Sequence, residues 1–205
     1  MAELVIEHIG KKDPEEEGWA FHKAKNTDSC GGKYGPIDDS GTEAWTMDDD
    51  ATCSGSAFMY ERSPTEGQNK RALENGWILS VKIRIVDIPD PVDTIIAQYW
   101  HGGTHIDYVM VFGSERDGDP IVQVGKQSYA IEGAGSTYHL YELKYDPEEK
   151  SADLFIDDVE RISNAAGRYR PEYPNINRIA FGSGDSKNTG HGNFALVSFE
   201  IHPGR

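Results

Sequence analysis

The sequence predicts an all-β domain folded as a two-sheet antiparallel β-sandwich of jelly-roll type. Three observations support this class: apolar and polar residues alternate after Trp77, the strand-like segments are short and closely spaced, and glycine, proline and aspartate separate them. The 205-residue length suits one undivided sandwich that can bury a real core. We therefore expect residues 1–205 to form a single domain.

The alternation is clearest in the strand that follows Trp77. Val81 and Ile85 belong to an apolar set that alternates with Lys82 and Arg84, so one face of the strand is expected to meet the core. Turn signals then divide the rest of the chain into short segments. The further strands expected are 94–101, 107–112, 121–124, 128–132, 138–145, 152–157, 176–181 and 193–202.

Residues 1–75 are predicted to be irregular but ordered, because aromatic side chains recur among many polar residues. One or two strands are expected here, at 4–8 and 44–47. A short helix should follow, with Ser63 as N-cap, Pro64 at the first helical position and Glu66 completing a capping box. Asn75-Gly76 should end it.

The net charge limits the kinds of binding partner, and the cysteines bear on the cellular compartment. A formal net charge of −15 opposes contact with nucleic acid phosphates, and the apolar runs are too short for insertion into a membrane. Cys30 and Cys53 are interpreted either as one disulfide, consistent with secretion, or as two free thiols. No basic-then-apolar leader opens the sequence, so a secreted protein without its signal and a cytoplasmic protein both remain open.

Four segments resemble a known superfamily, namely 76–84, 117–120, 138–147 and 152–159, together with the opening 9–19 and Trp45. They are similar to the laminin-G-like branch of the concanavalin A-like lectin/glucanase superfamily, as found in secreted bacterial proteins. The third and fourth segments match a hairpin of that branch, with Asp158 where glycine is usual. The resemblance implies a jelly roll and a lectin, a carbohydrate-binding module, a glycoside hydrolase or a polysaccharide lyase. No cofactor is required, but related sandwiches often hold a structural calcium ion, for which Glu7 and Asp185 are candidates.

The candidate ligand site comes from the side chains that alternation leaves outside the core. We expect Ile95 and Ala97 to be buried, which places Gln98 and Trp100 on an open face where an indole could stack on a sugar ring. Cations on the preceding strand suit an anionic sugar. The predicted ligand-binding set is Lys82, Arg84, Gln98 and Trp100, with His101, Asp107 and Tyr108 at the rim.

Three function classes follow, of which a carbohydrate-binding, lectin-like domain for a polysaccharide leads. The first alternative is a polysaccharide lyase or glycoside hydrolase that uses His101, Tyr108 and Arg84. However, Gln98 and His101 are one residue too far apart for the Gln-x-His strand of jelly-roll alginate lyases, and the Glu-x-Asp-x-x-Glu run of retaining glucanases is missing. The second alternative is a protein-interaction or adhesion module.

Overall fold

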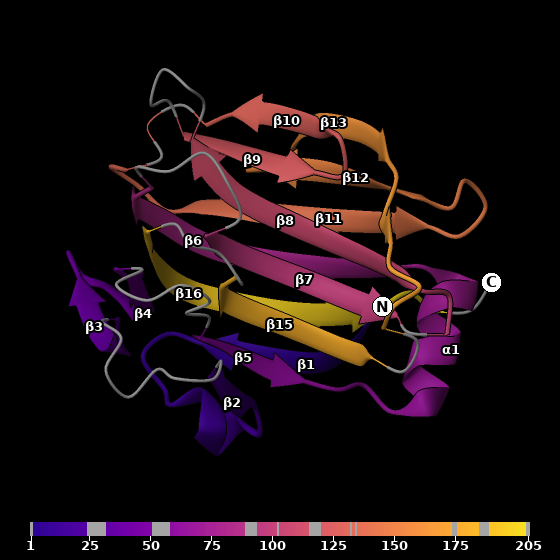
Figure 1. The fold of residues 1–205 in the computed structure, drawn as a ribbon, viewed down its shortest axis with the longest axis horizontal. Helices are drawn as coiled ribbons and strands as arrows, with labels where there is room; N and C mark the ends of the chain where they lie inside the picture. Colours follow the sequence, from indigo (N-terminus) through magenta and orange to yellow (C-terminus); the bar gives the residue numbers. More distant parts are fainter. Residues whose placement is uncertain are drawn as a thin grey trace.

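The computed structural model shows two antiparallel β-sheets packed face to face (Figure 1). It describes residues 2–23, 32–50, 58–88, 94–101, 103–114, 120–131, 133, 135–173, 176–184 and 189–203. The predicted β-sandwich is therefore confirmed. Cys30, Cys53 and Asp185 lie outside the described residues, so the disulfide stays a prediction.

The first sheet contains the strand with the clearest alternation, β6. Its strands run in the order β13-β12-β11-β6-β16-β4-β3, and β1 also pairs with β16. Their bounds are β1 Glu3–Ile9, β3 Lys33–Asp39, β4 Thr42–Asp49, β6 Trp77–Asp87, β11 His139–Asp146, β12 Ser151–Ile156, β13 Val159–Ala165 and β16 Gly190–Ile201.

The second sheet lies across the core from the first. Its strands run in the order β10-β9-β8-β7-β15-β5-β2, with the short β14 paired to β8. Their bounds are β2 Ala20–Lys23, β5 Phe58–Arg62, β7 Ile95–His101, β8 Ile106–Ser114, β9 Pro120–Val124, β10 Gln127–Ala130, β14 Arg168–Tyr169 and β15 Asn177–Ser183.

The core between the sheets follows the predicted alternation. Val81 and Ile83 of β6 face it fully buried, as do Ile95 and Ala97 of β7. Trp77 anchors one end by stacking on Tyr145, with ring centroids 5.4 Å apart. Burial of large aromatic and aliphatic side chains from both sheets supplies most of the stabilisation.

The predicted helix exists but begins at a different cap. Helix α1 spans Glu66–Asn75, and its N-cap is Thr65, not Ser63. The Thr65 hydroxyl accepts from the Gln68 main-chain N–H, and the Gln68 side-chain oxygen accepts from the Thr65 N–H at 2.8 Å. This capping box, which replaces the predicted one, satisfies two otherwise unpaired main-chain donors. Gly76 ends the helix as predicted.

The N-terminal part is more regular than expected. Its described residues form five strands, β1 to β5, and a 3-10 turn at Pro14–Glu17. The prediction of one or two strands was wrong, since β2, β3 and β5 were missed; β3 contains Gly35 and Pro36, residues that normally signal a loop, and β2 and β5 are short.

The hairpin that carried the resemblance is present, with β11 and β12 paired from Tyr141 to Asp146. At the following turn, Asp157 and Asp158 both have positive φ, 49° and 64°. Aspartate tolerates this left-handed conformation, so Asp158 replaces the usual glycine in a two-residue turn.

Candidate ligand-binding site

The structure divides the predicted ligand-binding set between opposite surfaces of the sandwich. Lys82 and Arg84 lie on the outer surface of the first sheet, whereas Gln98 and Trp100 lie on the outer surface of the second. The alternation was predicted correctly, but the strands were wrongly assumed to be neighbours. Between β6 and β7 the chain crosses from one sheet to the other, so their outward faces point in opposite directions.

On the first outer surface, Arg84 belongs to a closed hydrogen-bond network around Asp39. Its guanidinium donates to both Asp39 carboxylate oxygens, at 2.6 and 2.7 Å, and to the Gly135 carbonyl at 3.1 Å. Tyr138 and Asn193 also donate to Asp39, at 2.8 and 2.9 Å. Burial opposes ionisation, but these donors outweigh it and hold the pKa of Asp39 below its ordinary value. Lys82 is exposed on the same surface.

His101 and Tyr108 belong to the inner side of the second sheet. The Tyr108 ring packs in the core against Trp77, and its hydroxyl donates to the Lys150 carbonyl at 3.0 Å. His101 Nδ1 accepts from the Thr104 main-chain N–H at 3.1 Å. The proposed catalytic set of His101, Tyr108 and Arg84 is therefore not brought together, because its members face different sides of the two sheets.

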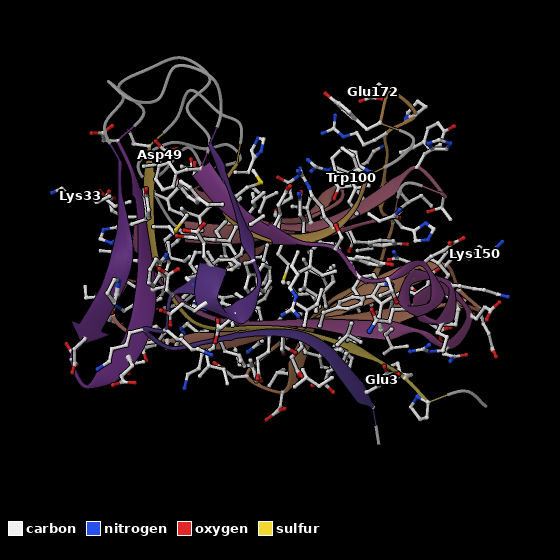
Figure 2. All side chains as sticks on the ribbon, turned by 90° about the horizontal axis from the view of Figure 1, so that it is seen from below. Glu3, Lys33, Asp49, Trp100, Lys150 and Glu172 are labelled. Atoms are coloured by element: carbon white, nitrogen blue, oxygen red, sulfur yellow. The ribbon has the colours of Figure 1, made fainter. Side chains whose placement is uncertain are left out.

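Gln98, Trp100 and Asp107 do lie together on the second outer surface. Trp100 pairs across the strands with Asp107, and Gln98 lies one step along the same face. Figure 2 shows Trp100 on this outer side, on the same side as Glu172. The expectation of an open indole was wrong, because Trp100 is only 7% exposed.

Trp100 is covered by an arginine and a tyrosine. The Arg178 guanidinium lies 5.5 Å from its ring centre, and the Tyr173 ring meets it edge-on at 5.2 Å. Arg178 also donates to Glu61 at 2.7 Å. The Gln98 amide oxygen is assigned toward Arg178, because only this orientation lets it accept from Nε and Nη2, both at 3.1 Å.

The segment after Gly167 completes this surface. Strand β14 pairs Arg168 with Asp107, and the Arg170 main-chain N–H donates to the His105 carbonyl at 2.7 Å. The Arg168 side chain also donates to the Asp107 carboxylate at 2.7 Å. A Cβ on Gly167 would lie 2.3 Å from the Ile106 side chain, so glycine permits this close approach.

Among the described residues, four buried polar atoms at this place have no hydrogen-bond partner: Trp100 Nε1, His105 Nδ1, Asp107 Oδ1 and Arg168 Nε. Buried polar groups are normally paired, so such a concentration needs an explanation. Two exposed aromatic rings lie beside them, Tyr169 at 68% exposure and Tyr173 at 48%. We call this set the arginine–aromatic cluster; it comprises Trp100, His105, Asp107, Arg168, Tyr169, Arg170, Tyr173 and Arg178.

Asp107 is the electrostatic centre of the cluster. It is 1% exposed, and burial raises the pKa of its carboxyl even though the Arg168 charge acts to lower it. The free-energy cost of removing the Asp107 carboxylate from water is therefore not fully offset by its bond to Arg168. A donor from a ligand or from water would complete its coordination.

A pocket adjoins the cluster through Arg178. It has a volume of about 450 Å³ and is lined by His22, Glu61, Ser63, Pro64, Ile176, Asn177 and Arg178. Because Arg178 and its partner Glu61 both line the pocket, a ligand there would meet the same guanidinium that covers Trp100.

The calcium candidates stay a prediction. Glu7 lies half-buried on β1, where its carbonyl accepts from Trp19 Nε1 at 3.0 Å. Across the part of the chain that the structure describes, no three His, Cys, Asp or Glu side chains gather in a metal-binding arrangement. In the same described part, no helix has the length and apolar character needed to cross a membrane.

Comparisons with known proteins confirm the fold. The chain matches no protein-family model and no curated protein sequence. Among solved structures, it is similar to a conserved carbohydrate esterase from Shiga toxin-encoding bacteriophage phi24B, at 10% identity and a TM-score of 0.63, over 99% of this chain and 100% of the other.

Two further likenesses are to binding domains of toxins. The binding domain of botulinum neurotoxin DC, solved with rat synaptotagmin II, gives 10% identity, a TM-score of 0.58 and coverage of 97% of this chain and 48% of the other. The binding domain of Paraclostridial Mosquitocidal Protein 1 gives 11% identity and a TM-score of 0.53, with coverage of 99% of this chain and 50% of the other. The chain thus spans about half the length of these toxin domains. At such identities these likenesses show a jelly-roll β-sandwich alone, and membership of the concanavalin A-like superfamily stays a prediction.

Proposed function

We propose that the protein is a carbohydrate-binding, lectin-like domain whose ligand site is the arginine–aromatic cluster. The observation that carries this proposal is the set of four unpaired, buried polar atoms beside two exposed tyrosines. A sugar offers hydroxyl groups that both donate and accept, together with an apolar ring face that can pack on an aromatic side chain. The cluster offers the complementary groups.

The individual roles follow from the atoms. Trp100 Nε1 and Arg168 Nε are donors and Asp107 Oδ1 is an acceptor, and because all three are buried a sugar reaches them through a bridging water or after the covering side chains move. Tyr169 and Tyr173 supply stacking surfaces at small conformational cost. The three arginines of the cluster each pair with a carboxylate, and Arg168 Nε is left over as a donor that suits the carboxylate or hydroxyl oxygen of a polysaccharide.

Binding without catalysis is the function that the geometry supports best. The set predicted for an enzyme is dispersed, and the cluster lacks an arrangement of two convergent carboxylates, because the Asp107 carboxylate is paired with Arg168. The solved structures that resemble this chain include a carbohydrate esterase and a toxin binding domain in complex with synaptotagmin II, which is consistent with either a glycan or a protein ligand.

A polysaccharide panel tests this proposal. Neutral, uronate-containing and sulfated polysaccharides are cast into native gels, and retardation of the protein is scored alongside release of reducing ends or unsaturated products. We expect retardation by an anionic polysaccharide without product. Product formation would replace binding with catalysis, and a panel without any retardation would favour a protein ligand.

A further inference from the structure

A second pocket lies at one edge of the sandwich. There β10 of the second sheet meets β13 of the first, as Figure 1 shows. The two edge strands are joined by Gln127, whose side chain donates to the Ser163 carbonyl at 3.0 Å. The pocket has a volume of about 450 Å³. It is lined by Tyr129, Ile131, His139, Ile156, Asp157, Val159 and Arg161.

One wall of this pocket is apolar. Ile131 and Ile156 are buried at its base, whereas Val159 is 47% exposed at its mouth. An exposed valine beside a concave apolar wall leaves surface that a ligand could remove from water. The pocket can therefore hold the apolar face of a small molecule.

Arg161 supplies an unpaired charge beside that wall. Its guanidinium lies 5.0 Å from the centre of the Tyr129 ring, which holds it by a cation–π contact. Each other described arginine bonds a carboxylate or a main-chain carbonyl; these are Arg62, Arg71, Arg84, Arg168, Arg170 and Arg178. Among the described arginines, only Arg161 keeps all its donors available.

Asp157, the one acidic side chain that lines the pocket, forms no hydrogen-bonded ion pair with Arg161. Asp157 accepts from Leu140 N–H at 2.9 Å and is bonded to His139 Nδ1 at 2.6 Å. Both of its carboxylate oxygens are therefore engaged by these two donors, and Arg161 acts on Asp157 only through its charge, without a hydrogen bond. An incoming carboxylate would meet the guanidinium without displacing an existing partner.

We infer that this pocket binds a small carboxylate ligand with an apolar face, and that Arg161 holds the carboxylate in a two-bond pair. The apolar wall receives the body of the ligand. The shared chemistry suits an aromatic acid or a single hexuronate. The site is separate from the arginine–aromatic cluster and does not depend on the proposed function.

Nuclear magnetic resonance titration of the full chain tests this inference. The probes are benzoate, glucuronate and uncharged benzamide, and the readout is the amide resonances of residues 129, 139, 157 and 161. We expect at least one carboxylate to shift these resonances in a saturable manner and benzamide to bind at least tenfold more weakly than benzoate. The carboxylate that binds more tightly identifies the source.

Variants assign the effect to Arg161. Arg161→Gln should weaken the better carboxylate by about tenfold to a hundredfold, because it removes a charged hydrogen-bonded pair. Arg71→Gln, which alters an arginine on α1 outside the pocket, should bind normally. The inference is overturned if neither carboxylate shifts the resonances, if benzamide binds as tightly as benzoate, or if Arg161→Gln binds like the original protein.

Discussion

The two outer surfaces of the sandwich hold polar clusters of similar composition but opposite hydrogen-bonding status. On the first sheet, Asp39 receives Arg84, Tyr138 and Asn193 in a closed network. On the second, Asp107 receives one arginine and keeps an unpaired oxygen, next to other unpaired atoms. A closed network stabilises the fold, whereas an open one retains hydrogen-bonding capacity for a ligand.

The pKa values of Asp39 and Asp107 are shifted in opposite directions, in agreement with this difference in hydrogen bonding. Asp39 has a lowered pKa, so its stabilising contribution is present above the ordinary value of 3.8 and is lost as the pH falls through its folded-state pKa. Asp107 has a raised pKa, so folding favours its protonated form, and stability falls as the pH rises above 3.8 through the folded-state value. One carboxylate supports the fold at neutral pH and the other opposes it.

The largest effect on stability should come from breaking the closed network. Asp39→Ala leaves the partly buried Arg84 without its carboxylate and removes four hydrogen bonds, so the free energy of unfolding at pH 7 should fall by about 2–4 kcal/mol. Urea unfolding measures this loss. The deficit should shrink as the pH is lowered through the folded-state pKa of Asp39, and a loss at pH 7 below about 0.5 kcal/mol would contradict the role assigned to this network.

A smaller loss should follow from disturbing how the open cluster is assembled. Gly167→Ala places a methyl group against Ile106 and should cost about 1–3 kcal/mol through overpacking, while weakening polysaccharide retention. The matched control is Gly67→Ala on α1, where a Cβ meets nothing within 4 Å. That control should be neutral or stabilising. Equal effects of the two variants would show that the segment after Gly167 is not tightly docked.

The smallest change in stability is expected at Asp107. Asp107→Asn removes a charge whose burial is costly and keeps an amide oxygen that can accept from Arg168, so the variant should match or exceed the original protein by up to about 1 kcal/mol at pH 7, and this advantage should grow as the pH rises from 3.8 toward the folded-state pKa of Asp107. Polysaccharide retention should nevertheless fall. Thermal unfolding across this pH range measures the trend, and a variant that loses more stability as the pH rises would reverse the sign argued for Asp107.

Local patterns in the sequence predicted local structure well and long-range placement poorly. The alternation around Val81 and Ile95 identified the core faces of β6 and β7, because side-chain direction depends only on strand geometry. No local pattern states that the chain changes sheets between those strands. The predicted site therefore combined Arg84 and Trp100, which the sandwich places on opposite sides.

The missed part of the site had a faint signal. Arg168-Tyr169-Arg170 and Tyr173 concentrate cationic and aromatic side chains in an acidic chain, but the segment lacks alternation and includes Pro171. Its position depends on pairing with β8, which is a long-range contact. Similarly, Ser63 and Thr65 each begin a sequence that fits a capping box, and only the packed structure selects Thr65.

The most direct test of the central claim compares the two outer surfaces in one binding experiment. Isothermal titration with a retained polysaccharide would use the original protein, the double variant Tyr169→Ala and Tyr173→Ala, and Lys82→Ala, which alters only an exposed side chain of the first sheet. Losing two stacking rings should weaken binding about tenfold or more, while Lys82→Ala should bind normally. Normal binding by the double variant together with weakened binding by Lys82→Ala would place the ligand on the first sheet and contradict this account.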